Sequence, residues 1–475
     1  MMPFKYKTIY CELIIQKVHF INLIGMCKKY FKQLRCFCII YKFKSIISSK
    51  IHFTFFLSTI FIVTKNYGQT TLDYYINAAK QNSPLINENK NLNKVNQFEI
   101  EKLIALYSKP QLGITANYLF APIVATSNGK NTLQLNSQGA DKYFGYDLGA
   151  TNGGQYQALL NVSQPLNNGQ RITTLSEQYN IATQVNENNI KLTAHDLEKI
   201  ITDQYLLCLQ DMKQFQYATE TISLLDNQKI LLKKLVESSI YKQSDLILLN
   251  IEYQNFLGQL ASYKSNYRRD LFDLNILSAI DDTALVILSE PTISLSTEAQ
   301  LSGFVEKYRL DSLNAINQQK IFELKYKPQL LAFANTGLNA TYAGTLPSRF
   351  GLGGGLSLVY NLFDGNQKNA NKKKTAVLLQ SLSTYKEKFE TQNKIRKSKF
   401  LQEINSYSER IAIIQEQLKD YKTLLDTYRK EIITGEISIT NYLITIKNMA
   451  IVQRDITLLL SQKLSLINTY NYWNW

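Results

Sequence analysis

The sequence has few of the residues on which most enzyme and metal sites depend. After residue 68 it contains one histidine, His195, and one cysteine, Cys208. A single histidine excludes multi-histidine metal sites and argues against a serine-histidine-aspartate triad. We therefore predict a protein that is not an enzyme and has no catalytic residue, no metal and no cofactor. We expect His195 at a surface or interface, and Cys208, which lies on an apolar stripe, in a core.

Long apolar runs are also absent after residue 68, where no stretch reaches the roughly 18 apolar residues of a conventional transmembrane helix. The apolar run from Ile51 to Val63 follows Lys42, Lys44 and Lys50, which is typical of a secretory signal peptide. We predict that residues 1–68 are an N-terminal extension and signal peptide cleaved after Gly68, with a membrane anchor as the alternative. The other cysteines, Cys11, Cys27, Cys36 and Cys38, all lie in this segment.

The charge is unevenly distributed. The net charge is +15, but residues 1–68 hold eleven Lys and Arg against the single acid Glu12, so ten of these charges lie there. The remaining surplus of five is too small to predict a phosphate-binding surface. We expect no nucleic-acid partner.

Two alternating stretches begin with the same four letters, Lys-Pro-Gln-Leu, at Lys109 and again 218 residues later at Lys327. In each, apolar and polar side chains alternate, as in a strand with one apolar and one polar face. Each is followed by a second alternating run. The four predicted strands cover about 110–121, 154–165, 328–342 and 350–362.

The pattern predicts that the four strands form two hairpins of the kind found in membrane β-barrels. A long segment, 121–154, rich in turn residues, separates the first pair, and a short one around 343–348 separates the second. The glycines at 351 and 353–355 lack the spacing of a nucleotide loop and lead into a strand, so we give them no phosphate-binding role.

The repeat continues beyond the strands at an offset of 196, which aligns Gly169 with Gly365 and Ser239 with Gly435. A longer first loop explains the change of offset. We therefore predict two repeats of one architecture, 69–283 and 284–475.

Each repeat also contains long helices. Neither proline nor glycine occurs between Gln170 and Tyr241, and apolar residues recur there every three or four positions. Seventy residues make a helix of roughly 105 Å. We predict return helices at about 244–280 and 440–472, a second long helix at 366–434, and shorter helices at about 72–107 and 297–325 before the first strand of each repeat.

Four strands do not close a membrane barrel, because the smallest closed barrels have about eight. An open edge is not tolerated in lipid. We therefore expect the strands of several copies to form one barrel. Three copies would supply twelve strands.

From about residue 70 onward, the sequence resembles the TolC-type outer membrane efflux proteins, also called outer membrane factors. The resemblance is carried by the order of helix, strand, strand, long helix and return helix, and by its duplication. Local matches are the strand entries at Pro110 and Pro328, the turns at Gly169 and at Asp364 with Gly365, and the text Gly-Glu-Ile-Ser-Ile-Thr-Asn-Tyr-Leu from Gly435.

The resemblance implies a mixed α and β membrane protein. It would be a homotrimer in the outer membrane of a Gram-negative bacterium, with a twelve-stranded β-barrel continuous with a periplasmic α-helical barrel. It also implies an exit duct of a tripartite efflux or type I secretion system. The partners would be a periplasmic adaptor protein, an inner-membrane pump of RND or ABC type, and outer membrane lipid.

In the family, the helix tips contact the adaptor and open or close the pore. The matching candidates here are Ser239, Ser244, Asp245, Leu246, Gly435, Ser438, Thr440 and Asn441. Ser239 replaces the glycine that family members usually have in the first repeat. Asn441 and Ile444 stand where many members carry acids that ring the pore, so an acidic constriction of the pore is not expected here. Alternatively, Ser244 and Asp245 simply cap the return helix.

Two questions stay open at this level. The basic run from Lys368 to Lys374 is either a solvated helix face or a site of attraction for anionic lipid or cargo. The rival interpretation of the whole chain is a secreted structural or adhesive coiled-coil protein without a channel, which explains the helices but not two in-phase alternating hairpins.

Overall fold

A computed structural model describes residues 71–297 and 302–475. These residues belong to one unit, which spans Gly68–Trp475. The predicted signal segment, its cleavage after Gly68 and the four cysteines within it lie outside the described residues. Within residues 71–297 and 302–475, no helix is both long and apolar enough to cross a membrane.

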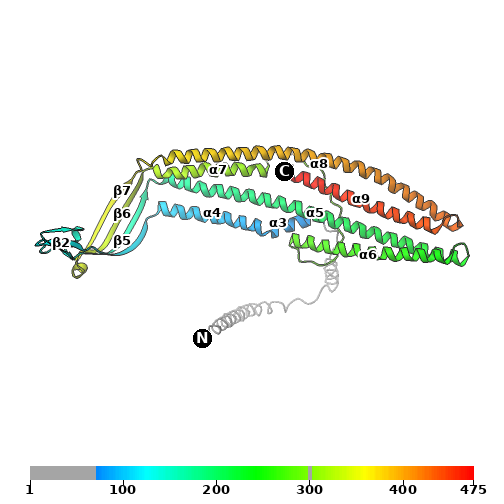
Figure 1. The fold of residues 1–475 in the computed structure, drawn as a ribbon, viewed down its shortest axis with the longest axis horizontal. Coiled ribbons are helices and arrows are strands. Elements are labelled where there is room, and N and C mark those ends of the chain that lie inside the picture. The colour runs from blue at the N-terminus through cyan, green and yellow to red at the C-terminus, as the bar shows by residue number, and fades with distance from the viewer. Residues whose placement is uncertain (1–70, 298–301) are drawn as a thin grey trace, which may run out of the picture. The chain divides into compact units, whose positions relative to one another are not determined.

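The predicted strands form one antiparallel sheet. Its members are β1 (Gln111–Phe120), β5 (Gly154–Leu166), β6 (Gln329–Ala340) and β7 (Phe350–Val359), in the order β1-β5-β6-β7 (Figure 1). Both predicted hairpins are confirmed, and the pairing of β5 with β6 joins them. Strands β1 and β7 are the edges of this sheet.

The register places most of the apolar residues of the four strands on one face. Tyr118 lies opposite Tyr156, and Tyr156 lies opposite Ala340. On the other face, one row across the four strands consists of Gly113, Asn161, Asn335 and Gly353. Because side chains alternate with a period of two, this register joins the separate alternating patterns into one continuous apolar surface.

The segment between β1 and β5 is more ordered than the sequence analysis expects. It contains β2 (Ile123–Ser127), β3 (Lys130–Gln134) and β4 (Lys142–Phe144), which form a second sheet in the order β3-β2-β4, and the 3-10 helix η1 (Asp147–Ala150). Asn128 and Gly129 have φ of 49° and 73° and form the β2–β3 turn. An Asn-Gly pair is a strong hairpin signal. The segment is rich in turns, as predicted, but its three strands were not predicted.

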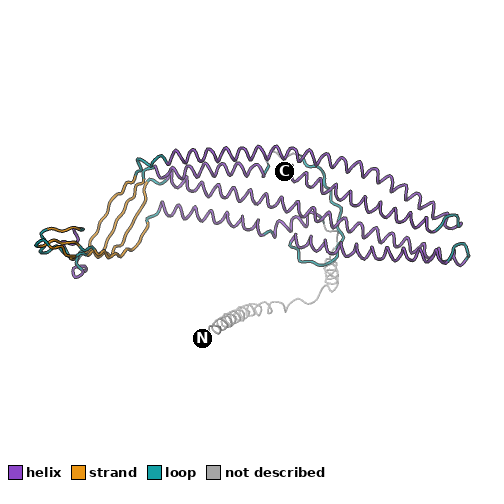
Figure 2. The backbone as a smooth tube through the Cα atoms, in the orientation of Figure 1, coloured by secondary structure: helices purple, strands orange, loops and turns teal. Residues whose placement is uncertain are grey.

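The long helices are as predicted. Helix α5 (Gly169–Glu237) has 69 residues and is followed by α6 (Gln243–Ser278), while α8 (Gln367–Thr434) has 68 residues and is followed by α9 (Ile439–Trp473). Each pair forms an antiparallel hairpin whose turn lies at the end away from the sheet (Figure 2). The tips are therefore far from the strands.

The first short helix is divided in two. Helix α3 (Leu72–Asn82) stops before Ser83, and α4 (Pro84–Ser108) starts at the next residue. The Ser83 hydroxyl accepts a hydrogen bond from the Ile86 N–H at 3.4 Å, and Pro84, which has no N–H, occupies the first helical position. The continuous helix predicted over 72–107 was wrong at this point.

The second short helix, α7 (Gly303–Glu323), is followed by the 3-10 helix η2 (Leu324–Tyr326), and a further 3-10 helix, η3 (Ala343–Ser348), joins β6 to β7. Residues 298–301, at the predicted start of α7, lie outside the described residues. Helices α4, α5, α7 and α8 lie side by side in this order, which repeats the order of the strands (Figure 1).

A core at mid-height joins α3, α5 and α6. It contains Cys208, which is completely buried, as predicted. Burial raises the pKa of this thiol, so it stays protonated and unreactive. Its main members are Tyr75, Ile201, Tyr205, Cys208, Leu271 and Leu274.

An aromatic cluster holds the end of α9 in place. The ring of His195 stacks between Tyr472 and Trp475, with centroids 4.8 and 4.2 Å away, and its Nε2 lies 2.9 Å from the Tyr472 carbonyl oxygen. Phe304 of α7 contacts the same rings. His195 is thus half-buried in an internal contact between the two halves of the chain, so of the expected surface or interface positions it occupies an interface.

Candidate functional site: the helix tips and the sheet

Both helix tips have the same backbone turn. Ser239 follows α5 with φ of 61°, and Gly435 follows α8 with φ of 76°. In the first turn the Ile240 N–H donates to the Leu235 carbonyl, and in the second the Glu436 N–H donates to the Glu431 carbonyl, at 2.9 and 3.1 Å. This bond pattern, with a left-handed residue inside it, is the Schellman ending of a helix. The two turns share these Schellman bonds at the offset of 196.

The return helices are capped by different residues. At α6 the Asp245 carboxylate accepts a hydrogen bond from the Lys242 N–H at 2.9 Å. At α9 the Ser438 hydroxyl accepts one from the Asn441 N–H at 3.3 Å. The capping role suggested for Asp245 is confirmed, but the cap position of α6 is Lys242, and Ser244 lies exposed in the first turn. Thr440 and Asn441 are also exposed.

The two tips contact each other. The Tyr241 hydroxyl donates a hydrogen bond to the carbonyl oxygen of Ile437, the residue at the same place in the second turn, at 2.7 Å. Gly435 approaches Ile240 so closely that a Cβ added to this glycine would lie 2.9 Å from the Ile240 Cγ2. The turns therefore meet at equivalent positions, and glycine at 435 suits both the left-handed backbone and the close contact.

An apolar core lies directly behind the tips. The half-buried Leu246 packs against it, and Ile432, Ile439 and Tyr442 within it are almost completely buried. The core draws on all four long helices: Leu225, Leu232, Leu235, Leu249, Phe256, Leu425, Ile432, Ile439, Tyr442, Leu443 and Ile446. In a single chain the two hairpins are thus held together at their ends.

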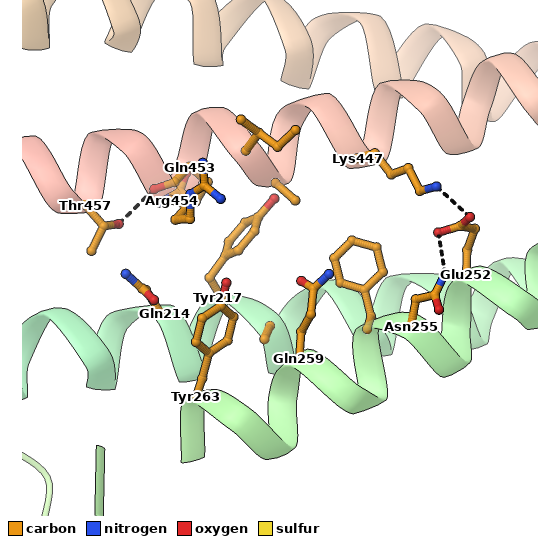
Figure 3. A pocket seen from close by; sticks show the side chains of 14 residues that line it. Gln214, Tyr217, Glu252, Asn255, Gln259, Tyr263, Lys447, Gln453, Arg454 and Thr457 are labelled. Carbon is orange, nitrogen blue, oxygen red and sulfur yellow. Dashed lines mark hydrogen bonds and ion pairs between the residues drawn. The ribbon is translucent and has the colours of Figure 1, made fainter. Parts of the chain in front are cut away.

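Above this core a groove of about 490 Å³ separates the α5–α6 hairpin from α9 (Figure 3). Tyr217 and Tyr263 project into it from α5 and α6. At one end the Lys447 ammonium of α9 forms an ion pair with the Glu252 carboxylate of α6 at 2.7 Å, and the Glu252 side chain is only 15% exposed. This ion pair crosses between the hairpins beside the groove.

In the described part of the chain, the apolar face of the sheet is largely exposed. Ile114 is 80% exposed and Leu352 is 88% exposed. Other exposed members of this face are Leu112, Tyr118, Phe120, Phe350, Leu356 and Leu358. A continuous apolar surface of this kind marks contact with lipid or with another protein.

The predicted strand entries and turns lie at the junction between sheet and helices. Pro110 and Pro328 directly precede β1 and β6, and Gly169 is the first residue of α5. The Asp364 carboxylate accepts a hydrogen bond from the Lys368 N–H at 2.8 Å and another from the Tyr326 hydroxyl, so it caps α8. Gly365, with φ of 66°, makes the turn beside it.

The contacts between the tips were missed by sequence reasoning. Tyr241 and Ile437 are 196 residues apart, the offset of the repeat, so the alignment of the two turns was the available signal. This alignment identifies equivalent positions in the two repeats but does not predict that they are in contact. Nothing in the sequence pairs Glu252 with Lys447.

The described residues combine two long helical hairpins with one four-stranded sheet. No family model matches the sequence, and no curated protein matches it either. Solved structures do match. VceC, an outer membrane protein of Vibrio cholerae, is 15% identical with a TM-score of 0.60, over 85% of this chain and 96% of its own.

Two further solved structures support the same class. The MtrE outer membrane channel of Neisseria gonorrhoeae, in its open state, is 13% identical with a TM-score of 0.58, over 85% of this chain and 88% of its own. The CmeC outer membrane channel of Campylobacter jejuni is 11% identical with a TM-score of 0.56, over 85% of both chains. The fold is similar to that of these TolC-type outer membrane channels, which confirms the predicted mixed α and β fold with long helical hairpins and four strands per chain. The trimeric barrel stays a prediction.

Proposed function

We propose that this protein is a TolC-type channel in the outer membrane of a Gram-negative bacterium. It would serve as the exit duct of a tripartite efflux or type I secretion system. The observation that carries the proposal is the uncovered apolar face shared by all four strands, at one end of helices of 69 and 68 residues. Lipid would cover this face, and the helices would extend into the periplasm.

The free edges of the sheet support a trimer. Successive strands are antiparallel, so β1 and β7 run in opposite directions. Strand β7 of one copy can therefore pair with β1 of the next in the same antiparallel pattern. Edge strands leave backbone groups unpaired, which lipid does not tolerate, and closing the ring removes both edges. Three copies would give twelve strands and, beneath them, a ring of long helices.

The helix tips would be the gate and the contact for a periplasmic adaptor protein, which links the channel to an inner-membrane pump of RND or ABC type. Supporting this are the exposure of Ser244, Thr440 and Asn441 and the contacts that hold the two turns together. In this proposal the mature chain starts after residue 68, and the repeats 69–283 and 284–475 each contribute one hairpin tip.

The experiment is to express the full chain in a Gram-negative host, purify it from outer membranes in detergent, and record single-channel currents in planar bilayers. We expect a trimer that conducts in discrete steps. A monomer that remains water-soluble without detergent and never conducts would contradict the proposal and favour the coiled-coil interpretation.

A further inference from the structure

The small sheet formed by β3, β2 and β4 carries an apolar row that is largely exposed. Val124 of β2 lies opposite Leu133 of β3 on one side and opposite Phe144 of β4 on the other. Leu133 is 74% exposed, Phe144 is 78% exposed and Val124 is 41% exposed. Because directly opposite side chains are neighbours on the face of a sheet, the three form one apolar patch. A patch of this kind marks a contact with something outside the chain.

The other face of the small sheet is packed. Ile123 and Ala125, on either side of Val124 along β2, are completely buried. The Tyr143 hydroxyl of β4 donates a hydrogen bond to the Asp147 carboxylate of η1 at 3.1 Å. These contacts fix which face of the small sheet is turned outward, and that face carries the apolar patch.

The segment folds toward the polar face of the main sheet. Leu119 of β1 and Gln155 of β5 lie opposite each other on that face. They line a depression of about 380 Å³ together with Tyr146 and Leu148. The connection from β4 to η1 therefore runs over the polar face, and Phe144 lies only two residues before Tyr146. In the proposed barrel the polar face lines the pore, so the small sheet lies on the pore side, at the end of the strands away from the helices (Figure 1).

The charges of the segment do not indicate an ionic partner. Residues 121–153 contain two lysines and two acids, namely Lys130, Lys142, Asp141 and Asp147. A balanced charge provides no net attraction for lipid phosphates and no net repulsion between copies of the segment. The apolar patch is thus the feature that selects the partner, and the same patch on a second copy is apolar as well.

We propose that the small sheets of three copies meet through Phe144, Val124 and Leu133 and narrow the outer mouth of the barrel. This inference rests on the proposed trimer, because threefold symmetry brings the same surface of each copy toward the axis. Apolar constrictions close pores by excluding water. The channel would thus have a closure at its outer end that is separate from the helix tips.

Cysteine crosslinking of the full chain tests the contact. Near a threefold axis a residue meets its own equivalent, and one disulfide joins two of the three copies. Phe144→Cys, alone or combined with Leu133→Cys, is therefore expected to give disulfide-linked dimers on a denaturing, non-reducing gel. Cys208 is buried and does not interfere. Leu352→Cys is the matched control, because Leu352 is as exposed but lies on the apolar face of the main sheet, and it should give no dimer.

Access to the pore from outside the cell tests the constriction independently of the helix tips. Asn117→Cys places a thiol on the polar face of β1, three residues before its end at Phe120. A maleimide carrying a polyethylene glycol chain, added to whole cells, should label this thiol about tenfold faster when Phe144→Ser and Leu133→Ser are added. Gln138→Ala, which changes an exposed polar residue of the same segment, should not alter the rate. Equal rates in the presence and absence of the two serines would overturn the constriction.

Single-channel recording separates this inference from the proposed function. Conducting trimers in which neither Phe144→Cys nor its combination with Leu133→Cys crosslinks would overturn the contact between small sheets and leave the channel standing. A protein that neither trimerises nor conducts would overturn both.

Discussion

Single residues with unusual backbone angles set the geometry of the tips. Ser239 adopts φ of 61° and Gly435 adopts 76° in turns with the same hydrogen bonds. A left-handed conformation costs a residue with a Cβ roughly 1–2 kcal/mol relative to the right-handed one. The first turn therefore carries strain that the second turn avoids.

Exchanging these residues should change stability in opposite directions. Ser239→Gly is expected to stabilise the protein by about 0.5–1 kcal/mol, because relief of strain exceeds the entropy cost of glycine. Gly435→Ala is expected to destabilise it by about 1–3 kcal/mol, because the new Cβ meets both a left-handed φ and the Ile240 side chain. Thermal melts of the detergent-solubilised variants would measure both effects, and equal responses would contradict this account.

A buried pair of acids makes stability depend on pH. Asp211 of α5 and Asp270 of α6 are 6% and 3% exposed, and the Nε of Arg269 donates to the Asp270 Oδ1 at 2.7 Å. Burial, together with a hydrogen bond to Asp270 and its charge, raises the pKa of Asp211 to about 7. Both carboxyl groups are poorly exposed to water, which disfavours a negative charge on Asp211 beside Asp270.

The sign of the pH effect follows from the raised pKa. The folded state favours the protonated form of Asp211. The stability that this group contributes is therefore fully present below the unfolded pKa of about 3.9 and is lost as pH rises through about 7. Between about pH 5 and pH 8 this should cost on the order of 2 kcal/mol, and Asp211→Asn should remove most of that loss. Denaturation at both pH values measures it, with Asp226→Asn, an exposed acid on the same helix, as the control. A parent protein with the same stability at both values would contradict the prediction.

At the scale of elements, two polar contacts join the hairpins near their tips: the Tyr241 hydroxyl bond to Ile437 at 2.7 Å and the Glu252–Lys447 ion pair at 2.7 Å. Further from the tips α5 and α9 are joined by other bonds, such as that of the Tyr472 hydroxyl to the Asp196 carboxylate at 2.6 Å. If the tips gate the channel as proposed, loosening the two contacts near the tips should favour the open state. Partly buried ion pairs of this kind contribute on the order of 1 kcal/mol, which is enough to change the populations of two states several-fold.

We therefore expect Tyr241→Phe and Lys447→Ala to raise the open probability of single channels about two- to fivefold. The trimer fraction should not change, because neither side chain is part of the proposed interface between copies. Lys388→Ala, which removes an exposed lysine of α8, is the control. Unchanged gating in both variants would show that these contacts do not hold the tips closed.

At the scale of the whole molecule, the two faces of the sheet should respond differently to charge. Leu356 lies on the uncovered apolar face of β7 and is 69% exposed, whereas its neighbour Ser357 points to the opposite face. Leu356→Arg should destabilise the barrel in a lipid bilayer by about 2–4 kcal/mol, and Ser357→Arg should cost much less. Unfolding from liposomes measures the difference. Equal costs would show that lipid does not cover the apolar face.

Much of this architecture could be predicted from the sequence. The strands follow from alternation with a period of two, and the long helices follow from an apolar recurrence every three to four residues without proline or glycine. Both signals are local. The same is true of the Asn128-Gly129 turn and of the break at Pro84, which were legible in the sequence but were not used.

The sequence by itself thus determined the elements, their order and the repeat, because each depends on residues close together in the chain. Only the tertiary structure decided which equivalent residues touch. The bond from Tyr241 to Ile437, the burial of Asp211 beside Asp270, and the stacking of His195 between Tyr472 and Trp475 all join distant segments. Such contacts depend on how helices of nearly seventy residues lie against one another, and local periodicity carries no information about that.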